Sequence, residues 1–367
     1  MTGGICTDKY MRKAEQKPDY YTQREWNRVQ ARVRAEKKNN RKLAFTVVLL
    51  LALTACAIWA VYFYVLKSHD STLRAAYGQA AGVMDTSRSG NRMTADPFSK
   101  DLCVTDSDVD PDAVFITSTE GALFDVNRQN VVYAKDIFEQ RPQASLTKLM
   151  TALLAFRYGN MDDIVTVTDT AFQIEEGSSV CELHLGDQLT LKQLVYGMMI
   201  ASGNDAAMTV AEHVGGSVEN FVQMMNDEAV KLGATHTHFV NPYGMTEEGH
   251  YTCAYDVYLT FNALLQYDMF LDIISRKNYY AEYKDASGDA YAMTWDTTDH
   301  YLDGSAETPD NVTVYGGKTG TTDAAGACLA IMSKDAYGNP YISVILNSQD
   351  KQQLYVDMNQ ILSLAGT

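Results

Sequence analysis

The longest apolar stretch of the chain spans residues 43–66 and contains no charged residue. At about 1.5 Å per residue, a helix of this length crosses a hydrocarbon core about 30 Å thick. The stretch is longer than the apolar core of a cleaved signal peptide, and no small-residue cleavage site follows it. We therefore expect an uncleaved transmembrane signal-anchor helix at residues 43–66.

Beyond residue 140, apolar residues three and four positions apart predict a series of helices. One helix begins at Ser145, a second covers residues 191–200 after a Thr190 cap, and a third follows a Ser217 cap and ends at Gly233. A further helix is expected from Thr252. These segments predict a helical subdomain in the middle of the chain.

The two ends of the same region have the pattern of strands. We expect a first hairpin of residues 113–118 and 122–125 around a turn at Glu120-Gly121, with residues 131–133 extending the sheet. A second hairpin is expected around Ser287-Gly288. The last section predicts three strands and a terminal helix, at residues 312–319, 327–333, 341–346 and 351–364. Joining both ends in one antiparallel sheet beside the helical subdomain gives an α+β fold.

Composition divides the remaining chain into an arm and a linker. Residues 67–112 are rich in Ser, Gly and Asp and have no sustained apolar period, which is typical of a linker. The acidic run at 106–112 lacks the glycine and closing glutamate of a calcium-binding EF-hand loop, so a solvated linker is the favoured interpretation. The predicted organisation is a basic arm (1–42), an anchor (43–66), a linker (67–112) and a folded domain (113–367).

The distribution of charge predicts how this organisation is oriented across a membrane. The chain has a formal net charge of −16, yet residues 1–42 contain 12 Lys and Arg against 5 Asp and Glu. Positive residues beside a membrane span remain in the cytoplasm, so we expect a cytoplasmic N-terminus and an extracytoplasmic folded domain in a single-pass membrane protein. Because this rule already explains the basic arm, nucleic acid is not an expected partner.

The cysteines and histidines predict no metal centre. Cys6 falls in the basic arm and Cys56 in the expected anchor, which leaves Cys103, Cys181, Cys253 and Cys328 for the exterior. Their spacing allows a disulfide but does not imply one, and buried free thiols are favoured. His236 and His238 are interpreted as turn and strand residues. We expect neither a metal nor another cofactor.

Three short motifs carry candidate chemistry. Ser145 lies three residues before Lys148 at a helix start, where both side chains share a face and backbone N–H groups can stabilise negative charge. Ser202-Gly203-Asn204 lies between two helices, and Lys318-Thr319-Gly320 lies on an expected strand. The order S-x-x-K, S-x-N and K-T-G is typical of serine penicillin-binding proteins and β-lactamases.

From about Val114 to Leu364 the chain resembles the low-molecular-mass penicillin-binding proteins that act as serine-type D-alanyl-D-alanine carboxypeptidases. The resemblance extends to Leu185-Gly186-Asp187, Asn204-Asp205-Ala206 and residues 237–244. It implies the β-lactamase/transpeptidase-like fold, an antiparallel sheet flanked by helices with an all-helical subdomain. It also implies removal of the terminal D-alanine from the stem peptide of peptidoglycan, with β-lactams as covalent inhibitors.

The motif residues suggest specific roles. Ser145 attacks a peptide carbonyl and forms an acyl-enzyme, a neutral Lys148 takes the proton, Ser202 relays it to the leaving amine, and Asn204 orients Lys148 or the substrate. Strand alternation places Lys318, Gly320 and Thr322 on one face, and substrate would lie along Lys318–Thr322 as an added strand. By resemblance, the backbone N–H groups of Ser145 and Thr321 form the oxyanion hole.

Two other functions fit part of the pattern. A class A β-lactamase is disfavoured because no E-x-x-x-N run supplies a deacylating glutamate, and Glu175-Glu176-Gly177 precedes a loop instead. A non-catalytic homologue that binds the cell wall would not need an activated serine. The chain departs from the family at one point, since no arginine stands where members commonly bind the substrate carboxylate. We expect Thr322 and Lys318 to serve there.

Overall fold

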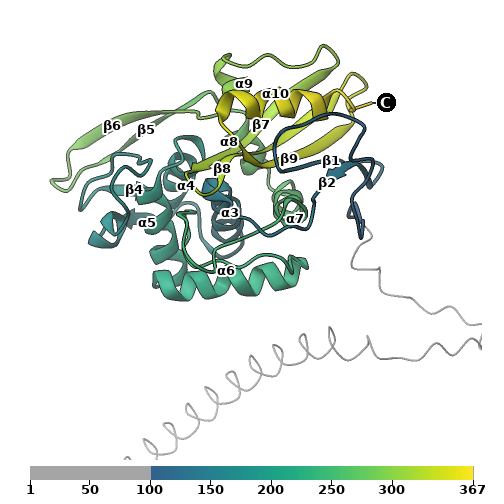
Figure 1. Ribbon diagram of the computed structural model, residues 1–367. Coiled ribbons are helices and arrows are strands. Elements are labelled where there is room, and N and C mark those ends of the chain that lie inside the picture. The colour runs from purple at the N-terminus through teal and green to yellow at the C-terminus, as the bar shows by residue number, and fades with distance from the viewer. Residues whose placement is uncertain (1–100, 367) are drawn as a thin grey trace, which may run out of the picture. The chain divides into compact units, whose positions relative to one another are not determined.

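The computed structural model describes residues 101–366, drawn in colour in Figure 1. The predicted basic arm (1–42), the predicted anchor (43–66) and the linker up to residue 100 lie outside the described residues. Within residues 101–366, no helix is long and apolar enough to cross a membrane.

A five-stranded antiparallel sheet joins the two ends of the described chain, as predicted. Its strand order is β2-β1-β9-β8-β7. The strands are β1 (Glu120–Asp125), β2 (Asn130–Lys135), β7 (Val312–Thr322), β8 (Gly326–Asp335) and β9 (Pro340–Ser348). β1 pairs with both β2 and β9, so the first strands of the domain hydrogen-bond to the last. The expected α+β class is confirmed, and β7 is left at one edge of the sheet.

Helices cover both faces of this sheet because successive strand residues point to opposite sides. On one face, Leu123 and Ile345 belong to the core formed with α10 (Lys351–Leu362). On the other face, Phe124 stacks on Tyr258 of α7 (Ala254–Leu264), with 4.0 Å between ring centroids.

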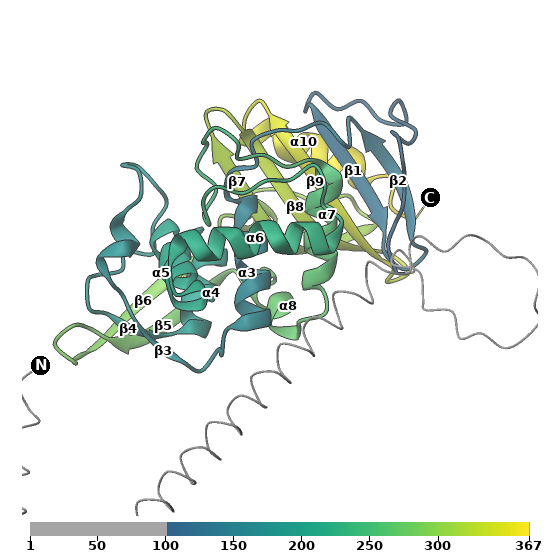
Figure 2. The ribbon, with the colours of Figure 1, turned by 90° about the horizontal axis from the view of Figure 1, so that it is seen from below.

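The helical part contains the predicted helices with nearly the predicted bounds. The Thr190 side chain caps α4 in a capping box with Gln193, and Ser217 caps α6, which ends at Gly233 with a φ of 76°. The elements of this part are α3 (Thr147–Tyr158), η2 (Asp169–Phe172), α4 (Leu191–Ile200), α5 (Asn204–Gly215), α6 (Val218–Leu232) and α8 (Asp268–Ile274). Figure 2 shows α7, α3, α4, α5, α6 and α8 on the side of the sheet away from α10.

The helical part also contains a four-stranded sheet in the order β3-β4-β5-β6, so it is not entirely helical. The hairpin of β5 (Asn278–Lys284) and β6 (Ala290–Asp296) was predicted, whereas β3 (Ile164–Thr166), β4 (Gln188–Thr190) and the short helix α9 (His300–Asp303) were not. Three-residue strands carry too little alternation to be recognised in a sequence.

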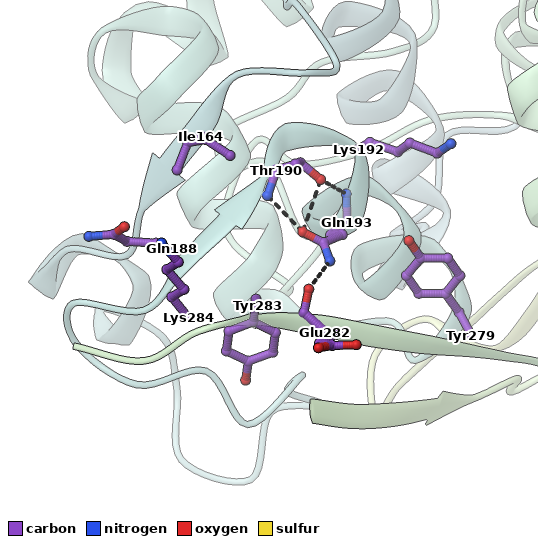
Figure 3. Close-up of a pocket in the computed structure, with 9 residues that line it drawn as sticks. All are labelled: Ile164, Gln188, Thr190, Lys192, Gln193, Tyr279, Glu282, Tyr283 and Lys284. Carbon is purple, nitrogen blue, oxygen red and sulfur yellow. Dashed lines mark hydrogen bonds between the residues drawn. The ribbon is translucent and has the colours of Figure 1, made fainter. Parts of the chain in front are cut away.

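A pocket of about 450 Å³ lies where β4, the start of α4 and β5 meet (Figure 3). β4 and β5 pair only through Gln188 and Lys284. The Gln193 side chain supplements this pairing by donating to the backbone oxygen of Glu282 at 2.7 Å. None of the residues lining the pocket belongs to the three sequence motifs, so we treat this pocket as a structural junction.

The predicted hairpin of residues 113–118 and 122–125 is wrong. Glu120 and Gly121 begin strand β1, and the partner of β1 is β2. Residues 113–118 form no strand because a buried carboxylate satisfies their polar groups instead. Asp357 of α10 accepts hydrogen bonds from the backbone N–H and the hydroxyl of Ser118, at 2.7 and 2.6 Å, and from Thr117.

The folded domain starts earlier than the predicted linker boundary at residue 112. Cys103 is fully buried, and its N–H donates to the Tyr258 hydroxyl at 2.7 Å. The Asp108 carboxylate accepts from the N–H groups of Asp136 and Ile137, at 2.9 and 3.1 Å. Residues 101–112 therefore contact the sheet and α7 instead of forming a solvated linker, because Cys103 and Asp108 have partners in the domain. All four cysteines of the described chain are free and buried, as favoured.

These contacts predict that residues 101–112 stabilise the domain. A protein that starts at Ala113 should have a free energy of unfolding about 2 to 4 kcal/mol lower than one that starts at Asp101, because it loses the burial of Cys103 and several hydrogen bonds. Urea unfolding of both proteins measures this difference. Equal midpoints with equal slopes would contradict it.

Candidate active site

The S-x-x-K motif forms the turn that leads into α3. Ser145 lies in the 3₁₀ turn η1 (Ala144–Leu146), and Lys148 lies in the first turn of α3. The Lys148 side chain is fully buried. Its Nζ lies 2.8 Å from Ser145 Oγ, 2.7 Å from Asn204 Oδ1 and 2.8 Å from the backbone oxygen of Tyr243. The predicted meeting of serine and lysine one turn apart is confirmed.

These three contacts define what a neutral Lys148 amine can do. An uncharged amine has two N–H donors and one lone pair. Asn204 Oδ1 and the Tyr243 carbonyl can only accept, so they take both donors and leave the lone pair to face Ser145 Oγ. Burial, and then the nearby charge of Lys318, lower the pKa of Lys148. The site is thus arranged for a lysine that accepts a proton from the serine.

The second motif projects from the junction of two helices. Ser202 follows α4 with a φ of 61°, a left-handed conformation that is uncommon for serine, and Asn204 is the first residue of α5. The Asp205 carboxylate holds the adjoining loop by accepting from the N–H groups of Cys181 and Leu183. This arrangement directs the Ser202 hydroxyl and the Asn204 amide toward the two lysines.

The third motif brings a second buried lysine to the same place. Lys318 lies on β7 and is 1% exposed. Its Nζ donates to Ser202 Oγ at 2.9 Å and to the backbone oxygen of Thr319 at 2.8 Å. Burial lowers the pKa of Lys318 to about 7. Hydrogen bonds therefore join Ser145, Lys148 and Asn204 in one group and Lys318 and Ser202 in another. The two groups adjoin through the Ser202-Gly203-Asn204 segment, and the charge of Lys318 acts on Lys148.

The edge strand β7 runs beside the nucleophile. A Cβ added at Gly320 would lie 2.9 Å from the backbone nitrogen of Ser145, so only glycine allows this approach. The neighbouring threonines are tied to flanking loops. Thr319 Oγ1 lies 2.5 Å from Thr298 Oγ1, and Thr322 Oγ1 lies 3.0 Å from Thr246 Oγ1. Thr321 is exposed on this strand, next to Gly320.

Sequence reasoning missed the loop that supports α3 from behind. The Tyr243 backbone oxygen binds Lys148, and the Pro242 backbone oxygen accepts from the Thr151 hydroxyl at 2.6 Å. Every residue has a backbone carbonyl, so no sequence motif could show which carbonyls bind Lys148 and Thr151. The only signal was the resemblance of residues 237–244 to the family, which assigned them no role.

The arginines of the described chain are engaged outside the three motifs. Each pairs with an acidic residue: Arg128 with Asp125, Arg141 with Glu120, Arg157 with Glu228, and Arg276 with Asp272. This pairing fits the expectation that no arginine serves a substrate carboxylate. The cations and donors beside Ser145 are then Lys318 and the threonine hydroxyls.

One group of side chains in residues 101–366 has the composition of a metal site. Potential ligand atoms of His236, Cys253 and Asp256 lie within 4.8 Å of one another. Asp256 already accepts from the N–H of His236 and the hydroxyl of Thr237, at 2.8 and 2.7 Å. These bonds explain the buried carboxylate as a loop anchor. The expected absence of a metal stays a prediction.

Comparisons with known proteins agree with this geometry. The sequence profile of the D-alanyl-D-alanine carboxypeptidase family matches residues 107–350. The chain is 41% identical over 151 residues to the D-alanyl-D-alanine carboxypeptidase DacF of Bacillus subtilis, covering 40% of this chain and 38% of the relative. It is 31% identical over 222 residues to DacD of Escherichia coli, covering 58% and 54%. The chain thus spans about two fifths to one half of the length of these relatives.

Solved structures show the same fold. A crystal structure of a Streptomyces DD-transpeptidase superposes with a TM-score of 0.64 at 26% sequence identity, covering 68% of this chain and 97% of that one. The expected β-lactamase/transpeptidase-like fold is confirmed. Because the family profile covers most of the described residues and the motif residues converge on one site, the chain belongs to the D-alanyl-D-alanine carboxypeptidase family.

Proposed function

We propose that the protein is a serine D,D-carboxypeptidase that removes the terminal D-alanine from the pentapeptide stems of peptidoglycan. The observation that carries this proposal is the environment of Lys148. Its amine lies 2.8 Å from Ser145 Oγ while two obligate acceptors occupy its other hydrogen-bonding directions. A serine beside a lysine held uncharged is an activated nucleophile.

The reaction follows from this arrangement. Ser145 Oγ attacks the carbonyl carbon of the penultimate D-alanine while its proton passes to Lys148. The C–N bond then breaks, and the departing amine receives a proton through Ser202, which links to Lys318 by a 2.9 Å hydrogen bond. Water hydrolyses the resulting ester and restores the Ser145 hydroxyl. The amine thus leaves with the proton that Ser145 gave to Lys148. In deacylation Lys148 takes a proton from the attacking water and returns it to Ser145 Oγ, so the chain ends in its starting protonation state.

Substrate binding is assigned to β7. This strand is an edge of the five-stranded sheet, so its outer backbone groups can pair with an extended peptide. Close packing of Gly320 against the Ser145 amide supports the expected oxyanion hole of the Ser145 and Thr321 N–H groups. Lys318, Thr319 and Thr322 are the groups proposed to bind the substrate carboxylate.

Two alternatives lead to different outcomes with penicillin. A non-catalytic homologue that binds the cell wall would form no covalent adduct. A β-lactamase would form one and lose it rapidly by hydrolysis. The contact of Ser145 with Lys148 and the burial of Lys148 and Lys318 favour an enzyme over a binding module, because binding alone does not require two buried amines.

We also propose that residues 43–66 anchor the protein in the cell membrane, with residues 1–42 in the cytoplasm and the described domain outside. The proposal rests on the uncharged 43–66 stretch and the basic bias before it. It places the enzyme on the side of the membrane where peptidoglycan lies.

Penicillin should acylate Ser145. Mass spectrometry of the full-length protein in detergent should show a stable adduct of one penicillin on the peptide that contains Ser145, and none in Ser145→Ala. Lys148→Ala should remain folded and lose at least a hundredfold in acylation rate, because it lacks the base. An adduct in Ser145→Ala, or unchanged kinetics in Lys148→Ala, would assign the nucleophile or base elsewhere.

Acylation should also depend on the charge of Lys318. Its pKa is lowered to about 7, so the ammonium that attracts the penicillin carboxylate is lost as pH rises through 7. We expect the second-order acylation constant to fall above about pH 7. Lys318→Arg should be slower but should lack this alkaline decline, since arginine stays charged. A wild-type constant that keeps rising to pH 9 would contradict this assignment.

The proposed topology predicts a specific protease pattern. Protease added to intact cells without an outer barrier should digest the domain beyond Lys67 and leave the basic arm intact, because the arm is shielded in the cytoplasm. Antibodies against tags at each end of the chain report the fragments. Loss of an N-terminal tag in intact cells would reverse the orientation.

A further inference from the structure

The backbone that presents the nucleophile is held in an unusual conformation. Ala144, directly before Ser145, has a φ of 48°, in the left-handed region that costs a residue with a Cβ about 1 kcal/mol or more. Such a conformation persists only where the surroundings impose it. The groups that contact the Ala144 carbonyl are therefore candidates for positioning Ser145.

A chain of buried polar groups ends at this carbonyl. His250 is 3% exposed, and its Nδ1 accepts from the backbone N–H of Val240 at 3.1 Å. The ring proton must then lie on Nε2, which donates to Thr147 Oγ1 at 2.8 Å. The Thr147 hydroxyl in turn donates to the Ala144 oxygen at 2.9 Å. Each step has one possible direction, so the chain fixes both the ring and the hydroxyl.

The surroundings keep this chain in one protonation state. Burial lowers the pKa of His250 to about 4, so the ring is neutral at neutral pH. Gln143 Nε2 lies 3.3 Å from the same ring nitrogen. A protonated His250 Nε2 is compatible with this contact when the Gln143 amide turns its oxygen toward the ring, where it accepts. The Thr147 backbone N–H also reaches the Ala144 oxygen, so the Thr147 residue holds this carbonyl through two groups.

The segment that carries His250 also holds the proposed base. A Cβ at Gly244 would lie 1.9 Å from the Ala144 oxygen, and the Tyr243 oxygen accepts from Lys148. The loop at 240–250 thus approaches the Ala144 carbonyl directly at Gly244 and indirectly through His250 and Thr147. The same loop binds the Lys148 amine through the Tyr243 oxygen. A single loop controls the relative position of nucleophile and base.

We propose that His250 and Thr147 are positioning residues for Ser145, acting through the Ala144 carbonyl to hold Ser145 Oγ against Lys148. The inference rests on the proposed acylation of Ser145. Misplacing a reacting atom slows the chemical step much more than it weakens initial binding. The effect should therefore appear in the first-order acylation rate constant and leave the dissociation constant for penicillin nearly unchanged.

The test compares three variants of the full-length protein with wild type. Thr147→Val removes the hydroxyl and keeps the shape, whereas Thr147→Ser restores the hydroxyl. Thr260→Val is the matched control, because Thr260 is a buried helix threonine whose hydroxyl donates to the Asp256 backbone oxygen within its own helix, α7. Stopped-flow acylation separates the two constants, and thermal unfolding reports stability.

We expect Thr147→Val to acylate at least tenfold more slowly, Thr147→Ser to recover most of the rate, and Thr260→Val to lose stability with less than a threefold change in rate. A rate loss in Thr260→Val as large as in Thr147→Val, or none in Thr147→Val, would overturn the proposal. If wild type itself is not acylated, the proposed function fails first.

His250→Asn tests the proposal independently, and it replaces Thr147→Val if that variant does not fold. Asparagine can keep the acceptor for the Val240 N–H but is too short to donate to Thr147. We expect His250→Asn to slow acylation by a factor similar to that of Thr147→Val, and the double variant to be no slower than either single one. Multiplied effects in the double variant would show that the two residues act separately.

Discussion

The site depends on keeping two lysine amines out of water. Lys148 and Lys318 are 0% and 1% exposed, and taking an ammonium out of water without a counter-ion is costly. The described chain places no carboxylate in an ion pair with either amine, and both amines hydrogen-bond to hydroxyl, amide and carbonyl oxygens. Loss of the proton relieves the cost, which is why both pKa values are lowered. The surrounding fold buries both amines, whereas Ser145 remains partly exposed.

Two of the seven non-glycine residues with positive φ in the described chain lie at this site. Ala144 and Ser202 both have positive φ angles, 48° and 61°, and each adjoins or carries a reactive hydroxyl. Left-handed turns at these two points aim two side chains from the ends of different helices at one spot. The supporting contacts come from rigid elements, namely α3, the start of α5 and the sheet edge. The packing of the domain thus offsets the free-energy cost of these two backbone conformations.

Sequence reasoning predicted what side-chain identity determines. The Thr190 and Ser217 caps fixed helix starts to the residue, and the serine–lysine spacing placed Ser145 and Lys148 together. It failed where tertiary partners decide. The segment at 113–118 has strand-like composition but is held by Asp357, more than 200 residues later. Residues 101–112 have linker-like composition, yet Asp108 and Cys103 find partners in the domain. The roles of Tyr243 and His250 depend on backbone atoms, which no sequence pattern records.

The edge position of β7 links this architecture to substrate. An exposed edge strand is normally a risk because its free backbone groups invite pairing with other chains. Here the end of β7 lies against the Ser145 turn, and Gly320 leaves no room for a side chain between them. Thr298 and Thr246 contact the threonines on either side of Gly320 and so limit how the strand can shift. In the proposed binding mode, an extended peptide that pairs with this edge lies beside Ser145, so the free backbone groups of the edge strand would align the substrate for attack.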